Sequence, residues 1–552
     1  MHIQKNWTLT IYFLSCFVFV AYLSGSEVFS GSYTPDSEFY FTLQNYGNDI
    51  NSRAFEPAYY WTRLGKIVPV RLLGQFFSYS ISAEIYRNFL LLIIFTSVFV
   101  LIYKLSKSVL VGVFFASFFS LNSVILYFIG DQYITGSVIS AGTLSLCLSL
   151  IKGLNLSKQI LLCQILNGAA LGWLLVLHPY GFFLYFISSL SLNIYFYLVK
   201  SHRYFNFLKN EFVEIISLSI TFLLFLIAGQ RIFPNYSWFQ TTLYWIQILN
   251  PTDFTPQSLK YLLYETSFFV IYIVIILSLL FFFLTKNFVP LLLVIFSVAL
   301  PVIFTIINNG AHLYARYQTA LIWPFVLIAY SLIIVHFFRI FNIDKLKLTT
   351  FLLLLLILVI AGHVKTFPLY FLYSLPLICI IFSLISFYTA SYNSFIFFLI
   401  FSCASFQLFQ NTSPRGDFPL VSGQPYWLAF NSSQTKINLE KGVKIQNWVL
   451  ENTKVTDKLL VWNEPGADLV KFAAFQLWGP NSIDNASILS EYGLNSLITR
   501  NPEQIIIYYK NQLKADEYLL SMTSNGFRYI PRTCKRFFEP DPIFVCIYNK
   551  LL

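Results

Sequence analysis

Long apolar runs recur along most of this 552-residue chain, and they constrain its fold more than any other feature. A hydrocarbon core about 30 Å thick is crossed by a helix of roughly 20 apolar residues, which predicts about thirteen spans here. The predicted spans lie near residues 7–24, 88–103, 109–129, 133–151, 160–177, 181–199, 212–229, 264–284, 288–307, 318–338, 348–362, 367–388 and 394–410. We therefore expect a polytopic α-helical membrane protein.

Charged residues make up only 11% of the chain, whereas an ordinary soluble domain has about a quarter. The net charge of +11 comes largely from short links between the apolar runs. With the amino end inside, the cytoplasmic links carry Lys104, Lys107, Lys152, Lys158, Lys200, Arg203, Lys209, Lys286, Arg339, Lys345 and Lys347. The outward links carry only Arg231, Lys260, Arg316 and Lys365, so the bias predicts a cytoplasmic N-terminus and an extracytoplasmic C-terminus in the inner or plasma membrane. No basic stripe alternates with exposed aromatic residues, and we expect no nucleic-acid partner.

Composition also predicts two domains. Residues 1–410 form the transmembrane module, including a first outward loop at 25–87 with amphipathic surface helices, and residues 411–552 form a small extracytoplasmic α/β domain. In the second domain, KGVKIQNWVLEN has helical apolar spacing, and KLLVWN and QIIIYYK are short runs of strand type.

The chain end, RYIPRTCKRFFEPDPIFVCIYNK, predicts a hairpin about its Glu-Pro-Asp-Pro turn. Cys534 and Cys546 lie almost symmetrically about that turn. An outward compartment permits a disulfide between them, and two unpaired small core residues are the alternative. We find no catalytic motif in this domain, and purely structural roles suit Glu464 and Asp468.

The first loop begins with TPDSEFYFTLQNYG, in which Thr34 can cap a short amphipathic helix at the membrane surface. Asp36 and Glu38 suit the positive end of that helix. Because residues two apart on a helix point to different faces, we do not expect the two acids to act as a pair. Asp36, nearer the end of the first span, is the better candidate for chemistry, and Glu38 fits a capping role.

The loop continues with EPAYYWTRLGKIVPVRLLGQFF, an amphipathic segment that carries Arg63, Lys66 and Arg71. One interpretation is a surface helix whose cations extend to lipid headgroups. The other is that one or two of these cations hold a phosphate. Both interpretations remain open from these residues.

Three stretches together resemble the polytopic GT-C glycosyltransferases. They are the Tyr-Tyr-x-x-Arg-x-Gly-x-x-x-Pro run from Tyr59 to Pro69, the stretch HLYARYQTALIWP at 312–324, and GDQY with Asp131 in the next outward loop. The resemblance is to bacterial members similar to protein O-mannosyltransferases and the lipid A aminoarabinose transferase. Ser37 separates the two acids of the first loop, unlike the Asp-Glu pair of the eukaryotic mannosyltransferases.

The resemblance implies transfer of a sugar from a polyprenyl-phosphate carrier to a glycan, lipid or protein acceptor at the outward face. Asp36 would remove the acceptor proton. Arg316, with Tyr317, would bind the leaving lipid phosphate, and the next candidates are Arg63, Lys66 and, in LHPYG, His178. Asp131 would orient the acceptor or a basic partner, and Asp131 and Glu38 are the candidates for an acceptor-orienting residue or a second acid. The plainer alternatives are a headgroup anchor for Arg316, an interfacial residue for His178 and a helix cap for Asp131.

The sequence has neither a Walker loop nor a Gly-x-Gly-x-x-Gly segment after a strand, which disfavours a nucleotide-bound donor. The expected partners are a lipid-linked donor, the acceptor and membrane lipids, and no cofactor is expected. Asp36 and Asp131 have the oxygen ligands to share a divalent cation, but the first loop has no Asp-x-Asp spacing, which favours a metal-free enzyme.

Two other functions remain open. A transporter or flippase of a lipid-linked or small solute would place ionisable residues within spans. In this sequence the charged candidates gather instead at the outward ends of the predicted spans. A polysaccharide polymerase or ligase would share the lipid-linked donor.

Overall fold

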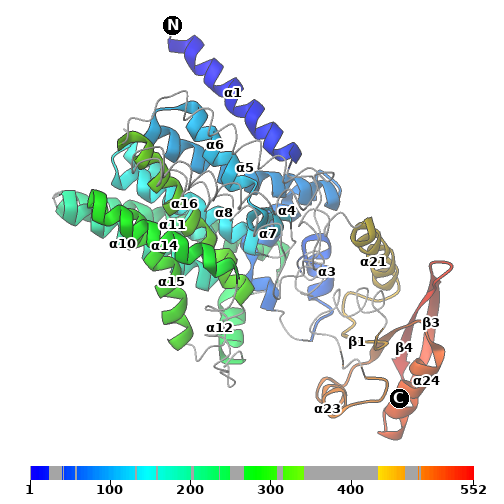
Figure 1. The fold of residues 1–552 in the computed structure, drawn as a ribbon. Helices are drawn as coiled ribbons and strands as arrows, with labels where there is room; N and C mark the ends of the chain where they lie inside the picture. The colour runs from blue at the N-terminus through cyan, green and yellow to red at the C-terminus, as the bar shows by residue number, and fades with distance from the viewer. Residues whose placement is uncertain are drawn as a thin grey trace. The chain divides into compact units, whose positions relative to one another are not determined.

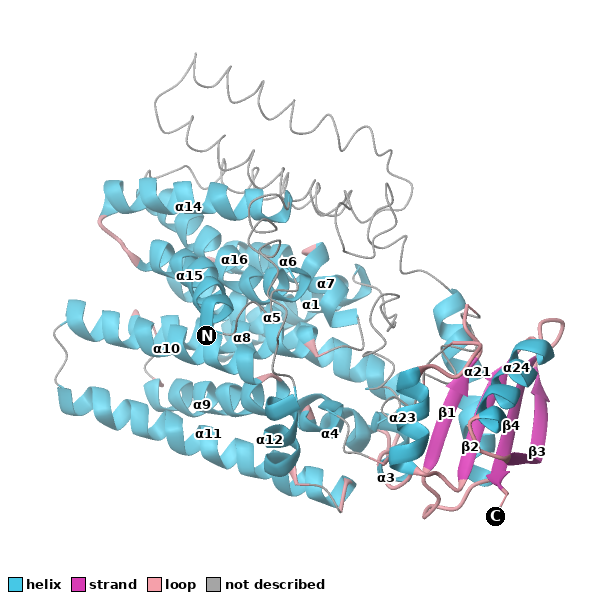
Figure 2. Ribbon diagram, turned by 90° about the horizontal axis from the view of Figure 1, so that it is seen from below, coloured by secondary structure: helices cyan, strands magenta, loops and turns pink. Residues whose placement is uncertain are grey.

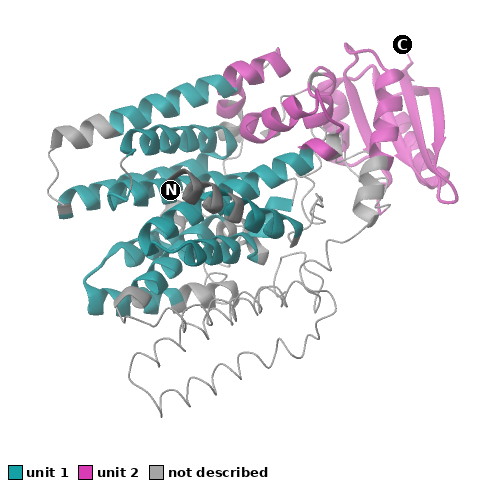
Figure 3. Ribbon diagram, turned by 90° about the horizontal axis from the view of Figure 1, so that it is seen from above, with its two compact units in different colours: residues 1–28, 83–225, 250–431 teal, residues 29–82, 226–249, 432–552 magenta. Residues whose placement is uncertain are grey.

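The computed structural model describes residues 2–23, 40, 43–55, 59–130, 134–156, 159–200, 204–234, 237–248, 266–307, 315–340, 433–466, 483 and 486–551. Contacts divide the chain into two units, coloured in Figure 3. Unit 1 comprises Met1–Val28, Ala83–Phe225 and Asn250–Asn431, and unit 2 comprises Phe29–Ser82, Leu226–Leu249 and Ser432–Leu552. Most of the predicted first loop, Phe29–Ser82, thus groups with Ser432–Leu552, whereas the sequence analysis placed the loop in the transmembrane module.

Unit 1 is helical in its described residues (Figure 1). Its helices are α1 (His2–Leu23), α5 (Tyr79–Ser106), α6 (Val109–Ser120), α7 (Ser123–Gly130), α8 (Thr135–Gly153), α9 (Ile160–Leu177), α10 (Pro179–Lys200), α11 (Tyr204–Ile232), α14 (Thr266–Thr285), α15 (Val289–Ile307) and α16 (Ala315–Ile340). The start of α5 and the end of α11 fall in unit 2.

Five helical segments in the described residues are long and apolar enough to cross a membrane: Ile81–Ser106, Thr135–Gly153, Ile160–Leu177, Pro179–Val199 and Glu211–Ile232. Shorter apolar helices occur at Phe13–Tyr22, Val109–Ser120, Val274–Thr285, Val289–Ala299 and Leu321–His336. The prediction of a mostly helical, multi-pass membrane protein is confirmed at this level. The predicted spans at 348–362, 367–388 and 394–410 lie outside the described residues.

The span predicted over 109–129 is two helices rather than one. Helix α6 ends at Ser120, and α7 begins at Ser123. Asn122 separates them, because its side-chain Oδ1 accepts the backbone N–H of Ile125 at 3.4 Å. A side chain that caps a new helix in this way competes with continuation of the old one.

Helix α8 is the most enclosed of the long helices and contacts α7, α9, α10 and α16. Its small residues allow these neighbours to approach closely, as in other membrane bundles. The ring of Tyr185 on α10 occupies the place that a Cβ at Gly142 would need. That ring also stacks on Phe325 at 5.1 Å, and its hydroxyl donates to the carbonyl of Leu321 at 2.7 Å. Gly142 therefore permits the contact that joins α8, α10 and α16.

The C-terminal part of unit 2 is a four-stranded sheet (Figure 2). Its strands are β1 (Leu459–Asn463), β2 (Gln504–Tyr509), β3 (Tyr529–Phe537) and β4 (Ile543–Lys550), in the order β1-β2-β4-β3. β1 and β2 are parallel, and the other two pairings are antiparallel. The accompanying helices are α21 (Ser433–Glu451), α23 (Glu491–Arg500) and α24 (Gln512–Ser524).

Strands β1, β2 and β4 are buried on both faces of the sheet, to which their successive side chains point in turn, whereas most of the edge strand β3 is exposed. Leu459 and Val461 of β1 belong to one apolar cluster with residues of α21. Leu460 and Trp462 belong to the other, in which the Trp462 ring stacks on Tyr518 of α24 at 4.4 Å.

The β3–β4 hairpin pairs Cys534 with Cys546, and the structure joins the two by a disulfide with an S–S distance of 2.04 Å. Glu464 is buried just after β1, and its Oε2 accepts the N–H groups of Lys510 at 2.7 Å and Asn511 at 2.8 Å. This carboxylate holds the turn that leads from β2 into α24, a structural role.

The described parts of the first loop are α3 (Asn48–Asn51), the 3-10 helix η1 (Tyr59–Thr62), α4 (Leu64–Leu73) and flanking residues, and α12 (Trp238–Ile248) packs against η1. Tyr46 and Ile50 are members of the apolar cluster on the α21 face of the sheet. A loop that supplies core residues to a domain folds with that domain, which is why contacts group the two.

Candidate functional site

Two of the predicted phosphate-binding cations lie together at the start of α4. Arg63 is the residue that precedes the helix, and its side chain makes no capping hydrogen bond there. Lys66 lies in the first turn, three residues later, so the two are neighbours on the helix surface. Each is only 3% exposed. The structure therefore brings both cations into a buried setting rather than onto a water-exposed surface.

The electrostatics of this helix end favour an anion. The N-terminus of a helix carries a partial positive charge from its oriented peptide groups. Arg63 and Lys66 add two full positive charges at the same end. A phosphate, whose oxygens accept several hydrogen bonds, suits such a place.

The position of α4 is fixed by contacts from two sides within unit 2. Arg71, in its last turn, donates to the carbonyl oxygens of Asn45 and, at 3.3 Å, of Gln44. The amide of Gln44 donates back to the carbonyl of Lys66 at 3.4 Å. On the other side, the indole of Trp238 donates to the carbonyl of Thr62 at 2.8 Å. These bonds hold both ends of α4.

His178 lies at the junction of α9 and α10, in unit 1. Its Nδ1 accepts the backbone N–H of Gly181 at 3.0 Å, so the imidazole caps the first turn of α10. A ring nitrogen that accepts carries no proton, which places the ring proton on Nε2. The structure thus gives His178 a capping role, and its predicted contact with phosphate stays a prediction.

The predicted acids Asp36, Glu38 and Asp131 lie outside the described residues. Arg316 and Tyr317 lie in the first turn of α16, where the structure describes the backbone but not their side chains. The predicted meeting of Asp36 and Arg316 therefore stays a prediction. Within the described residues, no group of three or more His, Cys, Asp or Glu side chains is arranged to hold a metal ion.

Sequence reasoning missed a buried ionic cluster in unit 1. Lys152, in the last turn of α8, contacts Glu214 of α11 in a close ion pair and lies 3.6 Å from Glu211. The amide of Asn167 on α9 donates to Glu214 at 2.9 Å, and that of Asn193 on α10 donates to Glu211 at 2.9 Å. Four helices thus meet at one polar centre, which we call the Lys152 cluster.

The signal for the Lys152 cluster was present in the sequence. Glu214 lies inside the span predicted over 212–229, and Lys152 was read only as a cytoplasmic link residue. Gly168 and Gly172 on α9 also have the small-xxx-small spacing of close helix contacts. A Cβ at Gly168 would clash with the carbonyl of Glu214, so this spacing lets α11 approach α9.

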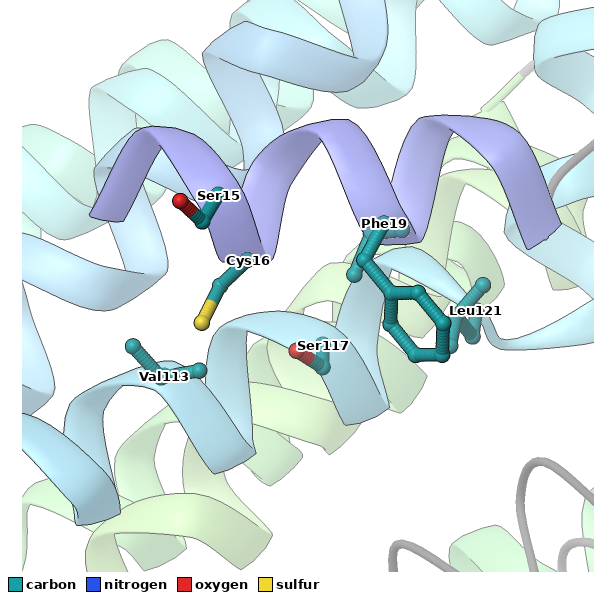
Figure 4. Close-up of a pocket in the computed structure, with 7 residues that line it drawn as sticks. Ser15, Cys16, Phe19, Val113, Ser117 and Leu121 are labelled. Atoms are coloured by element: carbon teal, nitrogen blue, oxygen red, sulfur yellow. The ribbon is translucent and has the colours of Figure 1, made fainter. Parts of the chain in front are cut away.

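A pocket of about 200 Å³ opens between α1 and α6 (Figure 4). Its lining is mainly apolar, with the Phe19 ring beside Leu121, and Cys16 faces α6 near Val113 and Ser117. Small-molecule sites usually measure about 300–1,000 Å³. This pocket is smaller and contains none of the predicted site residues.

Comparison with solved structures finds matches that extend over nearly the whole chain at low sequence identity. One is ArnT, an aminoarabinose transferase, from Cupriavidus metallidurans bound to undecaprenyl phosphate, at 10% identity, a TM-score of 0.49 and 98% coverage of both chains. The same protein in the apo state matches at 11% identity and a TM-score of 0.43, over 99% of this chain and 98% of that one.

An oligosaccharyltransferase from Archaeoglobus fulgidus, tethered to an acceptor peptide containing the NVT sequon, matches at 12% identity and a TM-score of 0.42. That match covers 99% of this chain and 74% of the archaeal one. No protein-family model and no curated protein sequence matches this chain.

Proposed function

We propose that this chain is a membrane glycosyltransferase that moves a sugar from a polyprenyl-phosphate carrier to a glycan, lipid or protein acceptor at the outward membrane face. The observation that carries the proposal is the pair of buried cations, Arg63 and Lys66, at the N-terminus of α4. A lipid-linked donor has one group that needs such a place, its phosphate.

The chemistry assigns the cations to the leaving group. As the bond between the anomeric carbon and the phosphate oxygen breaks, negative charge grows on the phosphate. Prearranged cations away from bulk water stabilise that charge and thereby lower the barrier. Arg63 is suited to bidentate contact with phosphate oxygens, and Lys66 contributes a point charge. Arg316 and Tyr317 keep the phosphate-binding role that their sequence motif suggests.

The acceptor hydroxyl must lose a proton as it attacks, and Asp36 is the proposed general base. Asp131, with Glu38, is proposed to orient the acceptor. The Cys534–Cys546 disulfide supports placing the C-terminal residues outside the cell, because such bonds persist in oxidising compartments. The tail and the first loop pack in one unit, so an outward tail supports an outward loop as well.

The test uses a deletion strain complemented with variants. Loss of the transferase should remove a sugar from envelope glycans and accumulate the polyprenyl-phosphate-linked sugar, both measured by mass spectrometry. Removing one electrostatic donor from a reaction centre typically slows the reaction about 10²–10³-fold, so Arg63→Ala and Lys66→Ala should each fail to restore the glycan. Asp36→Asn should fail as well.

Lys444→Ala is the matched control, because Lys444 is an exposed lysine of α21 in the same unit. It should restore the glycan fully. If the double variant Arg63→Ala/Lys66→Ala also restored it fully, these cations would not serve the reaction and the proposal would fall.

The Lys152 cluster favours a second candidate, a transporter or flippase, because ionisable residues buried among spans often mark ion pathways. Two variants distinguish a transporter from a transferase. For a transporter, Glu214→Gln should abolish solute movement and Asp36→Asn should preserve it. For the transferase, Asp36→Asn should abolish sugar transfer.

A further inference from the structure

Residues 43–55 of the first loop are built into the C-terminal domain. Tyr46 and Ile50 lie in the apolar cluster between α21 and the sheet. The Tyr46 hydroxyl also donates to Oδ1 of Asn447 on α21 at 2.9 Å. Some 400 residues of sequence separate these partners, so the contact is a tertiary one that closes a very long loop.

Arg53 is the central contact of this docking. It is 3% exposed, and its guanidinium donates to Oγ1 of Thr453 at 3.2 Å and to the carbonyl of Thr453 at 3.1 Å. It also donates to the carbonyls of Leu450 at 3.5 Å and Asp49 at 2.6 Å. Burial lowers the pKa of this guanidinium, and Asp49 and Asp457 raise it. A cation that meets the last carbonyls of α21 also complements the negative end of that helix.

Two further bonds continue the docking along β1. The N–H of Leu459 donates to the carbonyl of Arg53 at 3.2 Å, which covers the start of an edge strand. Lys458 donates to the carbonyls of Ser52 at 2.9 Å and Ala54 at 2.7 Å. The backbone of residues 52–54 is therefore fixed by the C-terminal domain.

The same segment holds the cationic helix. It begins at residues 43–47, where Gly47 adopts a left-handed φ of +51° that few other residues tolerate. Gln44 and Asn45 in this turn accept from Arg71 of α4, and Gln44 donates to the carbonyl of Lys66. A continuous series of contacts thus runs from the end of α21 through Arg53 and Tyr46 to α4.

From this series we infer that Arg53 and Tyr46 are positioning residues for the phosphate-binding cations. The C-terminal domain, through them, sets the place of Arg63 and Lys66, and is part of the donor site's scaffold rather than a separate acceptor module. This inference rests on the proposed function for the identity of the ligand, a polyprenyl phosphate.

The experiment measures binding of farnesyl phosphate, a short polyprenyl phosphate, to the full-length protein in detergent by calorimetry. Loss of hydrogen bonds from a charged group typically weakens an interaction about 10- to 100-fold, so we expect Arg53→Gln to raise the dissociation constant about tenfold or more. Arg528→Gln, which alters an exposed arginine of the same domain, should change nothing. Tyr46→Phe, which keeps the core ring, should give a smaller loss in the same direction.

A double-mutant cycle distinguishes a positioning role from a general loss of structure. If Arg53 acts through the cations, Arg53→Gln should add nothing to the loss caused by Arg63→Ala/Lys66→Ala, because coupled sites are non-additive. An additive loss would overturn the inference. Hydrogen exchange of the α4 amides supplies a second readout, and it should speed up in Arg53→Gln but not in Arg528→Gln.

The exchange measurement also separates this inference from the proposed function. If the wild-type protein did not bind farnesyl phosphate, the proposed ligand would be wrong, and α4 exchange would still report the coupling. Unchanged α4 exchange in both Arg53→Gln and Tyr46→Phe would overturn the inference whatever the ligand.

Discussion

Different interactions determine how the helices of unit 1 and the sheet of unit 2 pack. In the helices, a few polar contacts join apolar surfaces: the Lys152 cluster links α8 to α11. In the sheet, apolar side chains alternate on two faces. Lipid tails are as apolar as leucine, so apolar contact alone does not select one helix packing over another. For the sheet, the hydrophobic effect makes that selection, because exposing an apolar face to water is unfavourable.

The prediction with the largest expected effect concerns the polar contacts between the helices of unit 1. Lys152→Met leaves the buried Glu214 and the partly exposed Glu211 without their ammonium partner. Breaking a buried ion pair on one side typically costs about 3–5 kcal/mol. We therefore expect the detergent-solubilised protein to unfold at a lower temperature, while the C-terminal disulfide stays intact.

A second change should recover much of that loss. Replacing a whole buried ion pair with apolar residues of similar size is often neutral or stabilising. Lys152→Met/Glu214→Met should therefore unfold at a higher temperature than Lys152→Met alone. A double variant less stable than the single one would show that Glu214 contributes through its other partner, Asn167, more than through Lys152.

The next prediction concerns the β3–β4 hairpin, whose two strands are joined by a disulfide. Disulfides typically stabilise a protein by about 2–4 kcal/mol. Cys534→Ala/Cys546→Ala should reduce the unfolding free energy of the C-terminal domain by an amount in that range, measured by limited proteolysis in urea. Cys16→Ala, which alters a cysteine that lines the pocket between α1 and α6, is the control and should leave this transition unchanged.

A smaller effect tests how closely the helices approach. Gly168→Ala adds a Cβ where the carbonyl of Glu214 lies, and overpacking of this kind costs about 1–3 kcal/mol. An alanine in an open helix position would instead stabilise by about 0.5–1 kcal/mol. The sign of the change in melting temperature therefore decides whether α9 and α11 are in backbone contact, and a rise would contradict the structure.

Much of this fold could be read from the sequence, since periodicity and composition are local signals. The apolar runs predicted the helices, and KLLVWN and QIIIYYK lie where β1 and β2 are found. The break at Asn122 was missed, because one capping side chain within an apolar run hardly alters its hydropathy.

The candidate site was less predictable. The run around Arg63 and Lys66 identified them as candidates, but only the fold shows that both are buried. The docking of Arg53 on Thr453 has no local signature, because its partners lie 400 residues apart. Lys152 was assigned to topology alone, since nothing in one sequence shows that Glu214 on another helix faces it.

The smallest effect concerns Tyr46, whose hydroxyl donates from the first loop to Asn447 of α21. Tyr46→Phe removes its bond to Asn447, a loss of about 0.5–1.5 kcal/mol. Burial raises the pKa of Tyr46 above the usual value of about 10. Above pH 10 an unfolded Tyr46 ionises while the folded one keeps its proton, so its stabilising contribution is complete below pH 10 and is lost as the pH rises through the folded pKa.

The wild-type protein should therefore lose C-terminal stability between about pH 9 and 12 more steeply than Tyr46→Phe, followed by urea unfolding at each pH. Other buried tyrosines of the domain contribute equally to both proteins, so the difference between the two curves isolates Tyr46. Tyr492→Phe, which alters an exposed ring on α23, should reproduce the wild-type curve. Parallel curves for Tyr46→Phe and wild type would mean that Tyr46 is not held in the core at all, and that the first loop is docked by Arg53 and its neighbours alone.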